Sequence, residues 1–132
     1  MTVHIPKNES GGFVNNVTEN WKFKFDKIMH NASQEDVFDY CALETVQQVA
    51  NGYNGTVMCY GQTGAGKTFT MNGSTPNYKY RGIIPRAINQ IYQEVGRGLD
   101  HDFNIMVSFL EIYNEQIFDL LSDEPRDAYG AS

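Results

Sequence analysis

The sequence predicts a layered α/β fold in which helices flank a central mixed sheet. Three observations support this prediction. Apolar runs of strand length alternate with stretches of helical periodicity along the 132 residues, an order typical of layered α/β proteins. The run Thr56–Tyr60 is almost wholly apolar, as expected for a strand that is buried on both faces of a parallel or mixed sheet. A glycine-rich turn and the opening of a helix follow that run at once.

The first part of the chain contains two predicted strands and one predicted helix. Val3–Ile5 has the composition of a short strand, and residues 21–25 alternate apolar and polar side chains with the period of a strand. Ser33, with Asp36 three residues later, predicts a helix start. Gly52 is expected to close this helix, because glycine tolerates the left-handed cap conformation. The expected apolar stripe consists of Phe38, Cys41, Ala42, Thr45, Val46 and Val49.

The second part continues the alternation. A helix is expected to open at residues 67–71, and residues 72–82 are expected to form a polar loop. Pro85 suits the first turn of another helix, which Gly96 is expected to end. The expected stripe of that helix is Ile84, Ile88, Ile91, Tyr92 and Val95.

The last part contains the longest alternating run, Phe103–Tyr113, whose two faces are both largely apolar. We therefore expect it to be a strand inside the sheet. Ile117–Leu121 is a short apolar segment, and residues 122–132 form a polar tail.

Composition and charge limit the class of partner. The net charge is −6, so the chain lacks the clustered positive charge that nucleic acid or an anionic membrane surface requires, and we expect neither partner. No run approaches the roughly 20 apolar residues of a membrane span. Cys41 and Cys59 have no metal-binding spacing and are expected to be buried, reduced thiols, while the three histidines are scattered. These features favour a reducing, intracellular setting.

The motif that carries chemistry is the glycine-rich turn. Its sequence fits G-x-x-x-x-G-K-[ST] in full, with the residues Gly61, Gln62, Thr63, Gly64, Ala65, Gly66, Lys67 and Thr68. Glycines let successive backbone amides turn toward phosphate oxygens, and the helix that follows points its positive end at the same place. Lys67 supplies a mobile positive charge, and the Thr68 hydroxyl is a hard oxygen ligand of the kind that Mg²⁺ prefers. The alternative, a glycine-rich turn with a solvated lysine, is less favoured because the motif follows a predicted strand and opens a predicted helix.

A longer set of residues resembles the kinesin family. Tyr60 to Met71, read as Tyr-Gly-Gln-Thr-Gly-Ala-Gly-Lys-Thr-Phe-Thr-Met, is similar to the kinesin P-loop signature. Further kinesin-like stretches stand in kinesin order at 51–56, 81–86, 108–115 and 118–121. Residues 12–16, 22–26 and 77–82 resemble the ninth kinesin class, which works in cilia and flagella. The resemblance covers residues 2–121, and it implies the P-loop NTPase layered fold of a kinesin motor domain.

The resemblance implies roles for particular residues. Lys67 and Thr68 correspond to the residues that hold the phosphates and Mg²⁺ of bound ATP or ADP, with Thr68 as the metal ligand. Phe69 corresponds to a ring near the adenine, although a core-facing helix residue is the alternative. Glu111, Tyr113 and Glu115 match a family signature whose role is expected to be scaffolding. Arg81 and Arg86 are expected to be solvated or to brace a loop.

Several kinesin motifs do not occur in these 132 residues. They are the Arg-x-Arg-Pro strand end, the Asn-x-x-Ser-Ser-Arg-Ser-His switch and the Asp-Leu-Ala-Gly-Ser-Glu switch. Phosphoryl transfer needs a second acidic group at the metal and a group that positions water, so no complete catalytic set is expected here. We therefore expect an incomplete kinesin motor domain over residues 1–132, whose parent is a microtubule-dependent ATPase of the cytoplasm and cytoskeleton, and of the cilium or flagellum if the class resemblance holds. Its microtubule contacts are expected in parts of the parent domain outside this chain.

Two alternatives remain open from the sequence. One is a small P-loop enzyme of another class, such as a nucleotide kinase, against which the long kinesin-like context speaks. The other is a non-catalytic module, either nucleotide-binding or structural, derived from a shortened motor gene.

Overall fold

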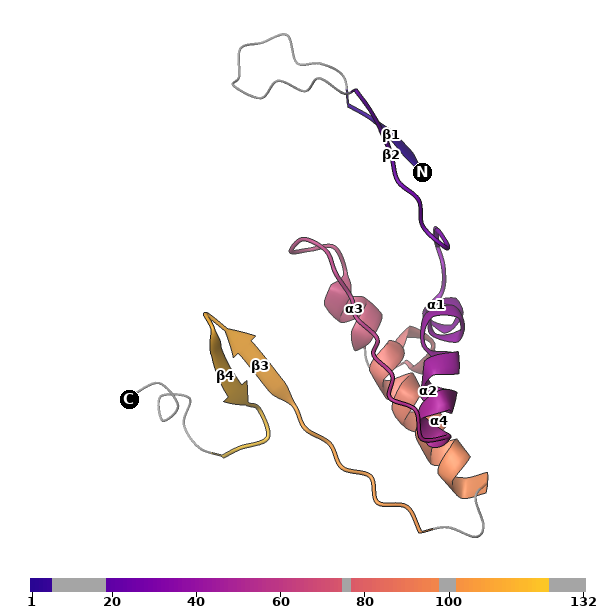
Figure 1. The fold of residues 1–132 in the computed structure, drawn as a ribbon, viewed down its shortest axis with the longest axis vertical. Helices are drawn as coiled ribbons and strands as arrows, with labels where there is room; N and C mark the ends of the chain where they lie inside the picture. Colours follow the sequence, from indigo (N-terminus) through magenta and orange to yellow (C-terminus); the bar gives the residue numbers. More distant parts are fainter. Residues whose placement is uncertain (6–18, 75–76, 98–101, 124–132) are drawn as a thin grey trace. The chain divides into compact units, whose positions relative to one another are not determined.

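The computed structural model describes residues 1–5, 19–74, 77–97 and 102–123 (Figure 1). Two compact units, Met1–Glu94 and Val95–Ser132, are described separately below. The first unit opens with a hairpin of β1 (Thr2–His4) and β2 (Asn20–Lys22), which pair antiparallel with Val3 opposite Trp21. The predicted strand over residues 21–25 thus begins one residue earlier and ends sooner. It ends because β1 is only three residues long. Past β1 the ladder continues only through Met1 and Phe23, where the Phe23 amide donates to the Met1 carbonyl and the Met1 amino group donates to the Phe23 carbonyl.

A capping box starts the first helix, as the sequence predicts. The Ser33 hydroxyl accepts a hydrogen bond from the Asp36 amide at 3.1 Å, and the Asp36 carboxylate accepts one from the Ser33 amide at 3.0 Å. A further bond from the Ser33 hydroxyl, at 2.6 Å, helps to hold the pKa of the Asp36 carboxyl below its ordinary value. The predicted single helix is divided into α1 (Gln34–Cys41) and α2 (Leu43–Ala50), because Ala42 departs from helical geometry with φ −132° and ψ −31°.

The core of the first unit lies among its helices. Its buried apolar members are Phe38, Ala42, Val46 and Ile83, and half-buried side chains that include Met71, Ala87 and Ile91 pack against them. Ala42 is only 1% exposed, so the helix break lies within the core. Of the expected stripe, only Phe38, Ala42 and Val46 are buried. Cys41 is exposed and Cys59 is half-buried, so the prediction of two buried thiols is wrong, although both cysteines are free.

The segment Thr56–Tyr60 is extended but forms no strand with any described residue, so this predicted strand is wrong. Only Val57 packs against the helical core, whereas Tyr60 is 97% exposed. An apolar run of this kind becomes a strand only when a neighbour supplies backbone hydrogen bonds, and the described residues supply none to it. The two sheets among the described residues are both two-stranded hairpins.

Two helices and a closed loop follow. α3 (Lys67–Met71) is joined to α4 (Ile83–Arg97) by a segment that contains the short 3₁₀ helix η1 (Tyr78–Tyr80). Gly73 and Arg81 form an isolated antiparallel bridge at the base of this loop. The packed face of α4 is Ile83, Ala87 and Ile91, while Ile84, Ile88 and Tyr92 are exposed. The predicted stripe of α4 therefore mixed two faces, because apolar residues occupy both of them.

The second unit contains one hairpin. β3 (Leu110–Tyr113) and β4 (Gln116–Asp119) pair antiparallel, with Tyr113 opposite Gln116. Asn114 and Glu115 form the two-residue turn with φ of 49° and 64°, as expected for a tight hairpin turn. The predicted strand Phe103–Tyr113 is confirmed only over its last four residues, because the stretch before Leu110 belongs to no strand among the described residues. Most of the predicted tail lies outside the described residues. Within the described ranges, no helix is both long and apolar enough to cross a membrane.

Candidate functional site

The glycine-rich turn lies between the extended segment 56–60 and α3 in the first unit. The Ala65 amide donates to the Gln62 carbonyl at 3.1 Å, which closes a tight turn. Gly64 and Gly66 have φ of +82° and +88°, values that residues with a Cβ rarely adopt. A Cβ added at either position would touch nothing within 4 Å, so the backbone conformation is the reason for glycine here.

The start of α3 presents unpaired backbone donors to this turn. The first helical hydrogen bond runs from the Thr70 amide to the Gly66 carbonyl at 2.8 Å. The amides of Lys67, Thr68 and Phe69 come before it and have no partner within the helix. Backbone donors at a helix start carry partial positive charge, so they favour an anion in front of the helix.

Lys67 places a full positive charge at the same turn. Its Nζ donates to the carbonyls of Gly61 at 2.7 Å and Gln62 at 2.9 Å, and its side chain is half-buried. The ammonium group has three donors on a flexible stem. It can therefore reach an anion in front of the loop without any movement of the backbone.

The remaining predicted residues of this stretch are accessible from solvent. Gln62, Thr63, Ala65 and Thr68 are exposed, and the Phe69 ring is 50% exposed. The turn therefore offers backbone amides, one cation and one hydroxyl, a donor set that fits a polyphosphate with its metal. Among the described residues, no group of three acidic, histidine or cysteine side chains could hold a metal ion.

A residue that the sequence reasoning missed is attached to the other end of α3. Gln34, only 7% exposed at the start of α1, donates from Nε2 to the Phe69 carbonyl at 2.8 Å. The available signal was its place four residues before Phe38, in line with the buried stripe of α1. A polar side chain on such a stripe needs a specific partner.

A glycine and an arginine hold the loop between α3 and α4. The Gly82 amide donates to the Asn72 carbonyl at 3.1 Å and brings the start of α4 against the end of α3. Arg86 is 7% exposed and donates from Nε to the Arg81 carbonyl at 2.9 Å, with its guanidinium 5.1 Å from the centre of the Tyr78 ring. Arg86 thus braces the loop, which is one of the two roles expected for it from the sequence. Arg81 is exposed, and its guanidinium lies 5.3 Å from the centre of the same ring.

The residues of the second predicted signature lie in the β3–β4 hairpin of the second unit. Glu111 is half-buried opposite Phe118, whereas Tyr113 and Glu115 are exposed. Their expected scaffolding role stays a prediction.

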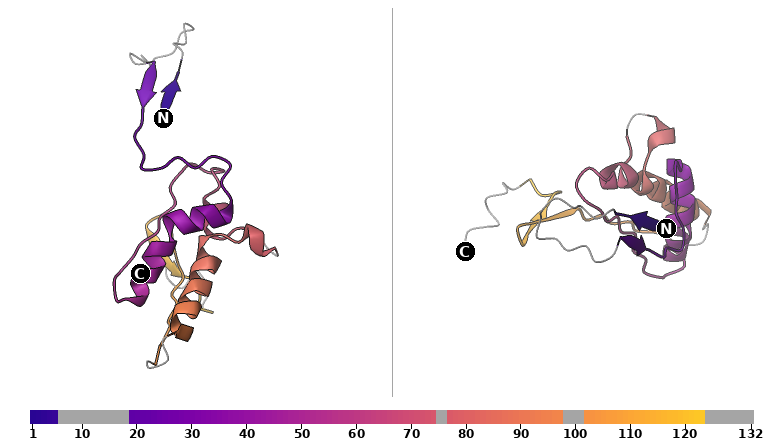
Figure 2. Two further views of the ribbon diagram at one scale, coloured as in Figure 1. Left: turned by 90° about the vertical axis from the view of Figure 1, so that its right-hand side faces the viewer. Right: turned by 90° about the horizontal axis from the view of Figure 1, so that it is seen from above.

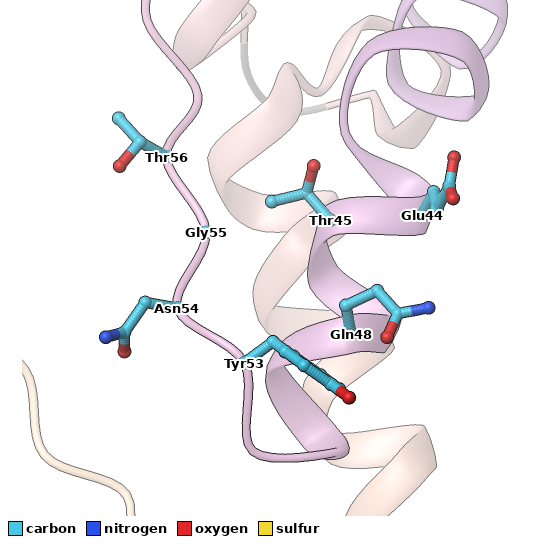
Figure 3. A pocket seen from close by; sticks show the side chains of 7 residues that line it. All are labelled: Glu44, Thr45, Gln48, Tyr53, Asn54, Gly55 and Thr56. Carbon is cyan, nitrogen blue, oxygen red and sulfur yellow. The ribbon is translucent and has the colours of Figure 1, made fainter.

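A separate cavity of about 410 Å³ lies between α2 and the segment that follows it (Figure 3). Thr45 of α2 points toward this segment, and a Cβ on Gly55 would collide with the Thr45 methyl group. Glycine at position 55 therefore allows the chain to pass close to α2 on its way to the glycine-rich turn. The cavity walls are formed by Glu44, Thr45, Gln48, Tyr53, Asn54, Gly55 and Thr56.

Comparisons with known proteins agree on one family. The kinesin motor domain family matches residues 3–130. The mouse kinesin-like protein KIF9 is 52% identical and the Chlamydomonas reinhardtii kinesin-like protein KLP1 is 50% identical, each over 125 residues. Each match covers 95% of this chain and 16% of the relative, so the chain spans only that share of these curated relatives.

A solved structure gives the same answer for the fold. The crystal structure of the Drosophila kinesin family member Kin10/NOD, in complex with divalent manganese and ADP, is 33% identical with a TM-score of 0.65. The similarity covers 73% of this chain and 35% of that chain. The predicted α/β class, a partial P-loop NTPase fold, is therefore confirmed.

Within that class, the chain belongs to the kinesin motor domain family. The predicted resemblance to the ninth kinesin class is confirmed by the matches to mouse and human KIF9, at 52% and 51% identity. This membership removes the alternative of a P-loop enzyme of another class, such as a nucleotide kinase.

Proposed function

We propose that this chain is the ATP-binding part of a kinesin-type microtubule motor. The observation that carries the proposal is the turn Gly61–Gly66, which ends directly on the first residues of α3 and holds the Lys67 ammonium group at its carbonyls. This combination is what binding of a nucleotide polyphosphate requires, and it occurs in a member of a motor family.

The roles of the individual residues follow from their chemistry. The amides of residues 64–68 and the Lys67 ammonium group bind the phosphates of ATP or ADP, and the Thr68 hydroxyl is a ligand for Mg²⁺. The exposed Phe69 ring offers an apolar surface to the adenine. Bound Mg²⁺ supplies charge neutralisation at the outer phosphates. The NOD structure with manganese and ADP supports these assignments by relationship, since that protein shares the fold.

Hydrolysis and movement are proposed for the parent protein rather than for these residues alone. Neither kinesin switch motif occurs in the 132 residues, so the second metal carboxylate and the groups that position water must come from other sequence. The partner of the parent is the microtubule, in line with a related NOD structure docked with bovine tubulin into a map of the microtubule complex. The proposed location is the cytoplasm and cytoskeleton, with the cilium or flagellum following from the KIF9 and KLP1 relationship.

Nucleotide binding is tested in a chimera in which this chain replaces the 125 matching residues of mouse KIF9. Lys67→Ala removes the cation at the turn, and the matched control, Lys24→Ala, removes an exposed lysine distant in sequence. Loss of charge-assisted hydrogen bonds predicts a fall of roughly ten- to a hundredfold in the affinity for magnesium ATP, with no change in the control. Equal affinity in the Lys67→Ala and unaltered chimeras would refute the assignment.

A second candidate function is a nucleotide-binding or structural module without turnover, favoured by the absence of both switch motifs from the 132 residues. The 132-residue chain is therefore expected to show no ATPase activity above background, with or without microtubules. Microtubule-stimulated turnover by this chain alone would contradict both candidates, because it would place a complete catalytic set within these residues. Turnover by the chimera, but not by the chain, is the result expected for part of a motor.

A further inference from the structure

The helix that carries Lys67 and Thr68 is too short to hold its own position. α3 has five residues, and an isolated helix of that length does not persist in water. Its direction must therefore be set by contacts with other elements. Because Lys67, Thr68 and Phe69 belong to one helical turn, any rotation of α3 moves the phosphate-facing groups together with the Phe69 carbonyl.

The Phe69 carbonyl is among the last carbonyls of α3, which have no partner within a helix. Gln34 supplies that partner from α1 through its 2.8 Å hydrogen bond, across 35 residues of sequence. The side chain of Gln34 is almost fully buried, so breaking this bond would remove the hydrogen-bond partner of a buried amide.

The capping box fixes the base of Gln34. Gln34 directly follows Ser33, whose hydroxyl and amide are bonded to Asp36. The backbone at position 34 is thereby held in the first turn of α1, and the glutamine side chain reaches α3 from a fixed point. The order of the connection is the capping box, then Gln34, then the Phe69 carbonyl.

Packing alone does not set the distance between α1 and α3 at this place. A cavity of about 250 Å³ lies beside the bond, with Met29, Val37 and Thr70 among its walls. Where side chains leave such a space, α3 can shift without a steric clash. The hydrogen bond thus adds a directional contact between α1 and α3 to the packing of Met71 against the core.

We propose that Gln34 is a positioning residue for the nucleotide site, acting as a remote cap of α3 that sets the direction of Lys67 and Thr68. This inference rests on the proposed function, because it assigns Gln34 an effect on phosphate binding. Gln34 does not touch the phosphates, and it acts through the orientation of the helix.

Three variants in the KIF9 chimera test the proposal. Gln34→Leu keeps the volume but removes the donor, and Gln34→Glu replaces the amide with a carboxyl that donates only when protonated. Gln47→Leu makes the same change at an exposed glutamine of α2 and serves as the control. The readouts are the affinity for magnesium ADP and, without nucleotide, the hydrogen exchange of the α3 amides.

Removal of the donor predicts roughly three- to tenfold weaker magnesium ADP binding and faster exchange of the amides at 70–72 in Gln34→Leu. At pH 8, Gln34→Glu is expected to bind magnesium ADP as weakly as Gln34→Leu does. Its affinity is expected to recover toward pH 6, because burial and the nearby carbonyl favour the protonated carboxyl, which can donate a hydrogen bond. The affinity of the unaltered chimera, measured at both pH values, corrects for pH effects that come from other protein groups and from the phosphates of the nucleotide.

The outcomes separate this inference from the proposed function. If the unaltered chimera does not bind magnesium ADP, the proposed function and the inference fall together. If it binds, and Gln34→Leu binds as tightly or Gln34→Glu shows no recovery at low pH, only the role of Gln34 is overturned. Recovery in Gln34→Glu but not in Gln34→Leu cannot come from a general loss of folding, so it identifies the hydrogen bond as the cause.

Discussion

Replacing Gly82 with alanine should destabilise the contact between α3 and α4 by a purely steric effect. Gly82 is buried, and its φ lies outside the left-handed region, so alanine can adopt the backbone conformation. An added Cβ would lie 2.5 Å from the Met71 carbonyl oxygen and 2.6 Å from the Thr70 carbonyl oxygen. Ordinary contact between such atoms begins near 3.5 Å, so the end of α3 would have to move by about 1 Å.

The magnitude follows from the kind of atom that must move. Both obstacles are backbone atoms of α3 and cannot swing aside as a flexible side chain can. Overpacking of this kind costs about 1–3 kcal/mol in the free energy of unfolding. The measurement is urea unfolding of the KIF9 chimera followed by circular dichroism, with an unchanged slope showing that only stability has changed.

Gly96→Ala is the matched control because it makes the same chemical change, but its expected effect on the free energy of unfolding has the opposite sign. Gly96 lies within α4, and a Cβ there would meet nothing within 4 Å. Alanine at an open helical position stabilises by up to about 1 kcal/mol. If Gly82→Ala unfolds at the same urea concentration as the unaltered chimera or at a higher one, the close approach of Gly82 to the end of α3 is refuted.

Three further predictions concern the loop, the capping box and the whole chain. Arg86→Met removes three hydrogen bonds to loop carbonyls and should lower stability by about 1–3 kcal/mol and speed proteolysis of the loop, whereas Arg81→Met should change both less. Because hydrogen bonds from Ser33 lower the pKa of Asp36, the folded state gains stability from the ionised carboxylate above the unfolded pKa, near 4, and loses it as pH falls through the lower folded pKa. In acid-unfolding curves, the difference in unfolding free energy between the unaltered protein and Asp36→Asn should therefore be largest at pH 7 and decrease below about pH 4. A difference that does not change with pH would contradict this prediction. The isolated 132-residue chain should self-associate or unfold without a sharp transition, since the apolar segments around Tyr60 and in β3 are exposed; a compact monomer with one cooperative transition in size-exclusion chromatography and thermal unfolding would contradict this.

Local chemistry made part of this structure predictable. The capping box of Ser33 and Asp36 involves residues three apart, and it starts α1 where the sequence indicates. Gly52, with φ +89°, takes the left-handed conformation after α2 for the same local reason. The conformation of the glycine-rich turn also depends on neighbouring residues alone, so the motif could predict its path.

Contacts between distant residues could not be predicted in the same way. The break at Ala42 is marked by no glycine or proline, and Ala42 is almost fully buried by side chains from several elements. The segment Thr56–Tyr60 has the composition of a strand, but pairing depends on a neighbour that composition does not reveal. The bond from Gln34 to the Phe69 carbonyl joins two elements 35 residues apart, and only the fold brings them together.

The two apolar faces of α4 divide its sequence into independent sets of positions. Ile83, Ala87 and Ile91 pack on the core of the first unit, while Ile84, Ile88 and Tyr92 point away from it. Substitutions on the first face should change the stability of that core. Substitutions on the second face should instead change contacts that this face makes with other segments of a longer protein. Ile83 and Tyr92 lie nine residues, or about 13 Å, apart along the helix, so the effects of substitutions at these two positions should add, whereas Ile83 and Ala87, one turn apart on the packed face, should show a coupling energy. A mutational scan of this helix would therefore separate folding of the nucleotide-binding segment from its assembly with the remaining motor.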